Sequence, residues 1–244
     1  MKLIDQSVKV VYPSTLEEGI AELKKIEIAG RNCWRSEGKI TDDSYMAFIR
    51  GLIKRGHLSP VEFGTIMFEM TTSRDVMAEL TRHRVASFAI ESQRYVNESA
   101  EDGGIRFIKP LFFLPYDSGY ELDLEGHGHF KINTPDFENK GYNSDYHKRY
   151  NRSREWEETM EWIEERYLHL IDMGAKNQDA RKVLPNSTAC KIMMTVNLRE
   201  LLHIYDLRSS PAAYPEMREL MRLMKIEVDK VLPGFLPDKE ATNE

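Results

Sequence analysis

Arginine, histidine and serine gather in one short stretch of this 244-residue chain. Arg82, His83 and Arg84 are consecutive, and Ser92-Gln93-Arg94 follows after seven residues. Planar guanidinium groups are suited to bidentate contacts with phosphate. The chain has no glycine-rich phosphate loop, so these side chains would have to bind an anion themselves. The alternative is a basic helix end that only contacts solvent.

A second polar group lies further along the chain and consists of Arg181, Asn197, Arg199, His203 and Arg208. If a helix begins at Asn197, Arg199 and His203 are four residues apart and share one face. The leucines between them would take the core-facing side. Such a polar face is able to line an aromatic cofactor, and a solvated face is the alternative.

Other kinds of chemistry find little support. Ser92 lacks the Gly-x-Ser-x-Gly context of a serine nucleophile. Cys33 and Cys190 are too few for a disulfide framework or a cysteine-rich zinc site, and we expect both to be buried. His127-Gly128-His129 matches no zinc spacing and predicts a polar loop. We therefore predict no metal site.

Composition indicates a globular protein. The chain is 41% hydrophobic and 30% charged, with a net charge of −6. No apolar run approaches the ~18–20 residues of a membrane span, and Asp5 interrupts any signal peptide. Acidic side chains outnumber basic ones by seven to four in 115–150 and by six to three in 151–170. In 181–208, five bases face two acids, so the candidate site is locally cationic.

Hydrophobic periodicity predicts the elements that position these residues. Thr15 and Glu18 form a capping-box start for a helix that runs toward Cys33. We expect a second helix from Thr41 to near Gly56, a strand over Val61–Thr72, and a short helix that begins after Ser73 and ends at Arg82–Arg84.

The second half of the chain is richer in helices. An extended segment is expected over Ile105–Leu114, then a polar excursion at about 115–150. We predict a long helix over Ser153–Met173, a strand over Lys191–Val196, and helices from Asn197 and from about Pro215. Few strands and many helices in irregular order predict an α+β fold. We expect one domain over residues 1–244, with a small, mainly antiparallel sheet packed by several helices.

Several motifs, taken together, resemble those of one known family. Arg82-His83-Arg84, seven residues and Ser92 resemble the signature of flavin-dependent thymidylate synthases. Similar segments occur in the family's order at Gly56–Phe63, Val183–Asn186, Thr195–Glu200 and Leu207–Ser210. The likeness runs from about Ala29 to Met224, apart from 115–150.

The resemblance implies reductive methylation of dUMP to dTMP. Methylenetetrahydrofolate would supply the carbon, FAD would carry the hydride, and NADPH would reduce the flavin. Family members are homotetramers with active sites shared between subunits, and neither nucleic acid nor membrane is an expected partner. A cytoplasmic location is implied, or the host cytoplasm if a virus encodes the protein. The alternative is a nucleotide- or nucleic-acid-binding relative without methylating activity.

The resemblance also assigns roles to individual residues. Arg208 matches the catalytic arginine that contacts the uracil and favours its ionised form. Positions that bind dUMP are Glu79, Arg82, Glu91, Ser92, Gln93, Arg94, Arg181 and Arg208. Positions that bind FAD are Ser59, Arg82, His83, Arg84, Asn197, Arg199 and His203. Because the flavin delivers hydride to the ring, no protein nucleophile is needed.

Two residues depart from the family's pattern. Ile90 stands where a polar residue, often Glu or Gln, is usual, and we include its neighbour Glu91 among the nucleotide-binding positions for that reason. Tyr214 stands where Gln or His is common. Contacts to the nucleotide, flavin or folate are therefore expected to differ at these two places.

Overall fold

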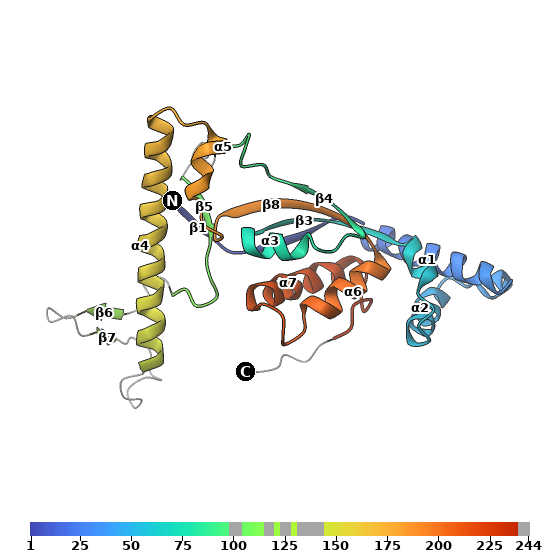
Figure 1. Ribbon diagram of the computed structural model, residues 1–244. Coiled ribbons are helices and arrows are strands. Elements are labelled where there is room, and N and C mark those ends of the chain that lie inside the picture. The colour runs from blue at the N-terminus through green and yellow to red at the C-terminus, as the bar shows by residue number, and fades with distance from the viewer. Residues whose placement is uncertain (98–103, 115–119, 123–127, 131–143, 239–244) are drawn as a thin grey trace. The chain divides into compact units, whose positions relative to one another are not determined.

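The computed structural model describes residues 1–97, 104–114, 120–122, 128–130 and 144–238 (Figure 1). The chain divides into two compact units. The smaller unit comprises Met1–Ile4 and Gln93–Pro185, and the larger comprises Asp5–Ser92 and Asn186–Glu244. The single domain predicted for 1–244 stays a prediction. Within the described ranges, no helix is both long and apolar enough to cross a membrane.

A four-stranded antiparallel sheet organises the larger unit, in the order β2-β3-β8-β4. Its strands are β2 (Ser7–Tyr12), β3 (Thr65–Ser73), β8 (Ala189–Asn197) and β4 (Ala86–Ile90). Side chains along β3 alternate between buried and half-buried, as the period of two predicts. Phe68, Met194 and Phe88 lie in register on three neighbouring strands.

Helices cover the sheet of this unit (Figure 1). Their buried side chains form one apolar core with it. The helices are α1 (Leu16–Cys33), α2 (Ser44–Lys54), α3 (Arg74–Leu80), α6 (Leu198–Arg208) and α7 (Pro215–Val231), with 3-10 turns η1 (Glu37–Lys39) and η2 (Ser59–Phe63). Fully buried side chains such as Phe68, Leu201 and Met224 each contribute about 1.5–3 kcal/mol to folding. The predicted α+β class is confirmed.

The predicted cap of α1 is present with one difference. Thr15 Oγ1 accepts a hydrogen bond from the Glu18 backbone N–H at 3.2 Å. The Glu18 carboxylate returns to Ser14 N and Oγ, one residue earlier than a capping box requires. Further along α1, a Cβ on Gly19 would lie 1.8 Å from the Val231 carbonyl oxygen. Glycine therefore permits the close approach of α1 and α7.

The smaller unit is built around one long helix. It contains β1 (Lys2–Ile4) parallel to β5 (Arg106–Ile108), the hairpin β6 (Tyr120–Leu122) and β7 (Gly128–Phe130), α4 (Ser144–Asp172), α5 (Asn177–Ala180) and the turn η3 (Arg181–Val183). Its own core includes Ile105, Phe107 and Tyr167. Gly174, at φ +89°, follows the end of α4 as predicted.

Some predicted boundaries differ from the structure. The strand predicted from Val61 begins at Thr65, because Ser59-Pro60 starts the turn η2, where proline suits the first position. The long helix begins at Ser144 rather than Ser153, inside the predicted excursion. The extended segment Ile105–Leu114 keeps only a three-residue strand, since Pro110 cannot extend the pairing. Of the rest of the excursion, the structure describes only the two strands β6 and β7, and the remainder lies outside the described residues.

Candidate active site

Glu79, His83 and Arg208 meet where the end of α3 lies against the end of α6. The Arg208 guanidinium donates from Nη1 to Glu79 Oε2 at 2.9 Å and from Nη2 to the Glu79 carbonyl at 2.9 Å. Its Nε donates to His83 Nε2 at 3.0 Å. Three hydrogen bonds from one planar group fix both its position and its orientation. Two sequence motifs are thereby joined, because Arg208 lies 125 positions from His83 and 129 from Glu79.

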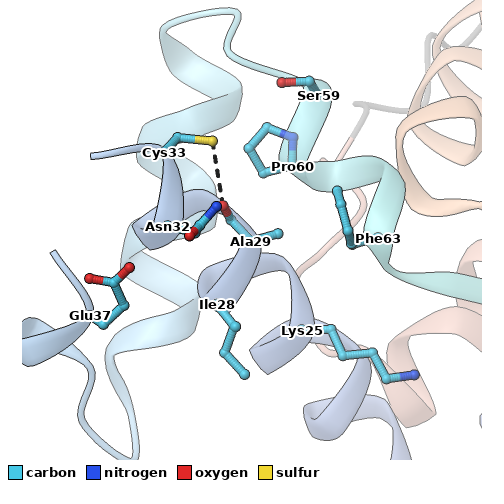
Figure 2. Close-up of a pocket in the computed structure, with 9 residues that line it drawn as sticks. All are labelled: Lys25, Ile28, Ala29, Asn32, Cys33, Glu37, Ser59, Pro60 and Phe63. Carbon is cyan, nitrogen blue, oxygen red and sulfur yellow. Dashed lines mark hydrogen bonds between the residues drawn. The ribbon is translucent and has the colours of Figure 1, made fainter. Parts of the chain in front are cut away.

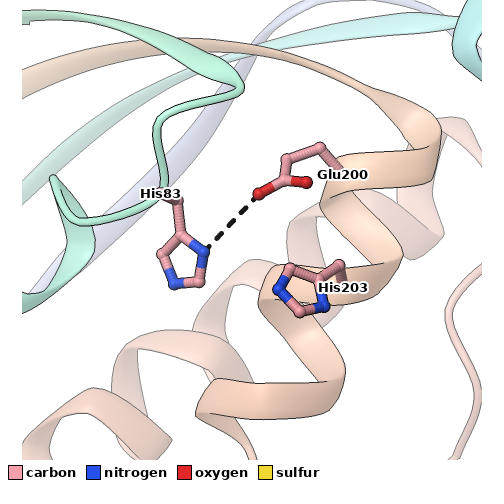
Figure 3. A group of neighbouring side chains, drawn as sticks. All are labelled: His83, Glu200 and His203. Carbon is pink, nitrogen blue, oxygen red and sulfur yellow. Dashed lines mark ion pairs between the residues drawn. The ribbon is translucent and has the colours of Figure 1, made fainter.

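His83 is almost fully buried, with 6% of its surface exposed. Its Nδ1 lies 3.6 Å from Glu200 Oε1, and its ring is edge-on to His203 at 5.9 Å between centroids (Figure 3). Burial lowers the pKa of His83, and the neighbouring Arg208 lowers it further, against the opposing effect of Glu200. The imidazole is therefore neutral at pH 7. Because Nε2 accepts from Arg208, the proton is assigned to Nδ1.

One group among the described residues has the spacing of a metal site. The ligand atoms of His83, Glu200 and His203 all lie within 4.8 Å of one another (Figure 3). Two imidazoles and a carboxylate are a ligand set that zinc uses. Arg208, however, holds a permanent positive charge against His83 and repels a divalent cation. The prediction of no metal site stays a prediction.

The start of α6 follows β8 without a loop. Asn197 ends β8 and caps α6, since its Oδ1 accepts from the Glu200 backbone N–H at 2.8 Å. Leu198 and Leu201 are buried, whereas Arg199 and His203 are exposed. This confirms the predicted division of the helix into an apolar face and a polar face. Asn197 has a structural role as a cap in addition to its predicted contact with FAD.

An open pocket lies beside Ser59, between α1 and η2. Its volume is about 590 Å³, and its lining is mostly apolar: Lys25, Ile28, Ala29, Asn32, Cys33, Glu37, Ser59, Pro60 and Phe63 (Figure 2). Cys33 lines it as an exposed residue, so the expectation that both cysteines are buried is wrong for Cys33 and correct for Cys190. Cys33 is the last residue of α1.

A second, smaller pocket shares Cys33, Ser59 and Pro60 with the first. Its volume is about 430 Å³, and its lining also includes Trp34, Gly56, His57, Leu58 and Arg199. The Trp34 and His57 rings stack at 5.8 Å between centroids. Arg199 forms an ion pair with Glu62. Ser59 and Arg199, two predicted FAD positions, thus line one cavity, together with aromatic rings that had not been singled out as site residues.

The remaining predicted residues of the larger unit are placed around the α3–β4 connection. Arg82 and Arg84 are exposed on either side of His83. Glu91 bridges to the central strand, because its Oε2 accepts from the Lys191 backbone N–H at 3.1 Å. Ile90 pairs with Ile192 at the end of β4. Ser92 is half-buried and is the last residue of this segment of the larger unit.

Three predicted nucleotide-binding residues belong to the smaller unit. Arg94 Nε donates to Gln178 Oε1 at 3.3 Å, and Arg181 is exposed in η3. Gln93 has a solvent-inaccessible Nε2 that makes no hydrogen bond to the described residues. A buried donor without a partner costs about 1–3 kcal/mol. Gln93 therefore carries a buried donor that the described residues leave unsatisfied.

Comparison with solved structures identifies a protein of similar fold. A UMP/dUMP methylase, PolB from Streptomyces cacaoi, in complex with 5-Br dUMP superimposes with a TM-score of 0.65 at 24% identity. The match covers 96% of this chain and 94% of that chain. At this level of identity, the likeness shows a common fold.

Sequence comparison defines the family. The model of the family described as thymidylate synthase complementing protein matches residues 15–234. The flavin-dependent thymidylate synthase of Haloarcula marismortui is 30% identical over 195 residues, 77% of this chain and 72% of the relative. That of Geobacter sulfurreducens is 30% identical over 211 residues, 82% of this chain and 76% of the relative. The chain belongs to the flavin-dependent thymidylate synthase family, which confirms the resemblance.

Sequence reasoning missed one member of the site. Glu200 had been named only as the end of the family-like segment Thr195–Glu200. The same residue directs its carboxylate at His83 (Figure 3). The i, i+3 relation of Glu200 to His203 on one helix face was the available signal.

Proposed function

We propose that this chain catalyses the reductive methylation of dUMP to dTMP, with methylenetetrahydrofolate as carbon donor, FAD as hydride carrier and NADPH as reductant. Family membership supports the reaction class. The observation that carries the proposal is the Arg208 guanidinium, fixed by Glu79 and His83 at the end of α6. A positive group held in one place is what an ionised uracil requires.

The residues present fit a flavin. The mostly apolar pocket beside Ser59 suits a fused aromatic ring system, and the exposed Arg82, Arg84 and Arg199 supply charges for its phosphates. We assign FAD binding to Ser59, Arg82, His83, Arg84, Asn197, Arg199 and His203. When bound and reduced, FAD supplies the hydride, for which no protein side chain is chemically suited.

Arg208 has the donors to act on the substrate. Its guanidinium carries five N–H groups, of which three are used in the bonds to Glu79 and His83. Two further N–H groups, one on each Nη, make no such bond among the described residues and are left for a ligand, since 17% of the side chain is exposed. There Arg208 would stabilise the charge on an ionised uracil without being consumed.

The other polar side chains bind the nucleotide in this proposal. Ser92 donates to the phosphate, and Arg82, Arg94 and Arg181 neutralise its charge. The buried amide of Gln93 supports this assignment, because a nucleotide oxygen would satisfy its donor. Glu79 acts mainly by holding Arg208. Glu91 holds Lys191 and acts by fixing the end of β4.

The assembly and location are part of the same proposal. We infer a homotetramer in which several subunits complete each site, in a cytoplasmic setting. The exposed Phe63 and Trp34 beside the flavin pocket support a subunit contact there. Neither nucleic acid nor a membrane is a proposed partner.

The test uses the purified full-length chain. We expect a yellow protein, or one that takes up added FAD, that bleaches with NADPH and forms dTMP from dUMP and methylenetetrahydrofolate. Arg208→Ala should lower dTMP formation by about 10²-fold or more while FAD binding survives. An equal loss of dTMP formation and of FAD binding would show that Arg208 has a structural role instead. If the protein binds nucleotide but forms no dTMP, the result would support the alternative, a nucleotide-binding relative without methylating activity.

A further inference from the structure

His83 lies between two side chains of α6, those of Arg208 and Glu200, and links them. Its Nε2 accepts from Arg208 Nε at 3.0 Å, and its Nδ1 faces Glu200 Oε1 at 3.6 Å (Figure 3). At 3.6 Å the second contact is an electrostatic attraction rather than a hydrogen bond. Both ring nitrogens of His83 therefore face protein groups. Each of these contacts favours one protonation state of the nitrogen that it involves.

The link works in only one tautomer. A proton on Nδ1 points at the Glu200 carboxylate and leaves the Nε2 lone pair for Arg208. The opposite tautomer would place an N–H against the Arg208 N–H and direct a lone pair at a carboxylate. Among the described residues around His83, only Glu200 provides negative charge at Nδ1, whereas Arg208 and His203 disfavour added positive charge.

We propose that Glu200 is a positioning residue for Arg208, acting through the tautomer of His83. This inference rests on the proposed role of Arg208 in dUMP activation. Glu79 holds the two Nη atoms from α3, and the Glu200–His83 pair holds Nε. The guanidinium plane is thus fixed from two elements rather than one.

Protonation of His83 would break the link. The imidazolium has no lone pair for Arg208 and would place two positive charges 3.0 Å apart. The charged groups that face His83 are Arg208, Glu200 and His203 from α6, with Glu79 reached from α3 through Arg208. We expect activity to have an acid limb governed by His83, below the usual pKa of histidine.

The experiment compares Glu200→Gln with Asp206→Asn, which removes a different acid from the same helix. Glu200→Gln leaves the helix cap intact, because the cap uses the Glu200 backbone N–H. We expect kcat to fall by about 10-fold at pH 8 through loss of Arg208 orientation. The acid limb should move to lower pH, because Glu200 no longer favours His83 protonation. Asp206→Asn should do neither.

A second readout is independent of turnover. In ¹⁵N-histidine-labelled protein, the ¹⁵N shifts of His83 should report the Nδ1–H tautomer in wild type and a mixture in Glu200→Gln. Glu200→Asp, which keeps the charge, should restore the wild-type tautomer and most of kcat. Unchanged tautomer and acid limb in folded Glu200→Gln would overturn the inference. A tautomer change in a protein that forms no dTMP would refute the proposed function and leave the structural link standing.

Discussion

Tyr214 Oη donates a hydrogen bond to Asp75 Oδ2 at 3.0 Å. Asp75 lies in the first turn of α3, and Tyr214 ends the segment that follows Arg208. Because α3 also carries Glu79, the partner of Arg208, the two segments are joined at two points. The tyrosine that departs from the family pattern therefore has a structural role: it ties the chain after α6 to the start of α3.

Tyr214→Phe removes this hydrogen bond and little else. We expect a loss of about 0.5–1.5 kcal/mol in the free energy of unfolding, at the low end because Tyr214 is only partly buried, with 36% of its surface exposed. Urea denaturation measures it. A double-mutant cycle with Asp75→Asn should return a coupling energy of similar size, and additive effects would contradict the contact.

The same bond should give stability a dependence on alkaline pH. Burial raises the pKa of Tyr214, and the hydrogen bond to Asp75 raises it further. A raised pKa in the folded state means a contribution that is complete below the unfolded pKa of about 10 and lost as pH rises above it. The stability difference between wild type and Tyr214→Phe should shrink above pH about 10. A constant difference from pH 8 to 11 would refute this.

Glu22→Gln tests a buried carboxylate in α1. Glu22 accepts from Tyr12 Oη, from Lys25 Nζ and from the Thr65 backbone N–H at 3.0 Å. Loss of these charge-assisted bonds should cost about 1–3 kcal/mol at pH 7. Glu17→Gln, an exposed change on the same helix, should cost less than about 0.5 kcal/mol. Chemical denaturation of both variants provides the comparison.

The cost of Glu22→Gln should also depend on acid pH. Burial raises the pKa of Glu22, but the bonds from Lys25, Tyr12 and Thr65 outweigh it, and the net pKa is lowered. The contribution is therefore present above the unfolded value of 4.5 and lost as pH falls below it. Wild type and variant should converge in stability as pH falls below 4.5, and a gap that stays constant from pH 7 down to the acid transition would argue against the network.

Gly19→Ala tests the contact between α1 and α7. The added methyl group would meet the Val231 carbonyl oxygen at 1.8 Å, so the helices must move apart. We expect a destabilisation of about 1–3 kcal/mol, although alanine favours helix. Gly38→Ala is the matched control, since nothing lies within 4 Å of its Cβ. Thermal unfolding should separate the two variants by several degrees.

Two substitutions of Asn197 separate its role as a helix cap from its proposed contact with FAD. Asn197→Ala loses the bond to the Glu200 N–H and should cost about 0.5–2 kcal/mol in stability. Asn197→Asp keeps an acceptor at the cap and should retain stability. If Asn197 also binds FAD as proposed, the aspartate variant should bind FAD more weakly at normal stability. Normal FAD affinity in both variants would limit Asn197 to its cap.

Local patterns were sufficient to predict most elements. The alternation along Ile66, Phe68 and Met70 and the cap residues Thr15 and Asn197 are signals within a few residues, and both kinds are present in the structure. The strand Ala86–Ile90 was missed. Of its five residues only Phe88 and Ile90 have a high strand propensity, and its pairing with β8 depends on residues over 100 positions away.

The site itself was predictable only through the family's motifs. No local signal tells that Arg208 bonds to His83, since the two residues are 125 positions apart. The pairing of Glu91 with Lys191 and of Tyr214 with Asp75 is likewise a product of tertiary contacts. Spacing along the chain indicated which residues are chemically able to act. The tertiary fold determines which of them lie in contact.

The absence of a loop between β8 and α6 has a consequence for chain connectivity. Asn197 pairs with Thr65 as the last residue of the strand, and the Leu198 N–H already bonds to the Gly64 carbonyl at 2.9 Å. New termini opened by circular permutation between these two residues would release the central strand and the arginine-bearing helix at once. Termini opened at the exposed turn around Gly38 would leave both in place. The junction is thus a poor point for permutation, insertion or fusion, and the turn is a suitable one.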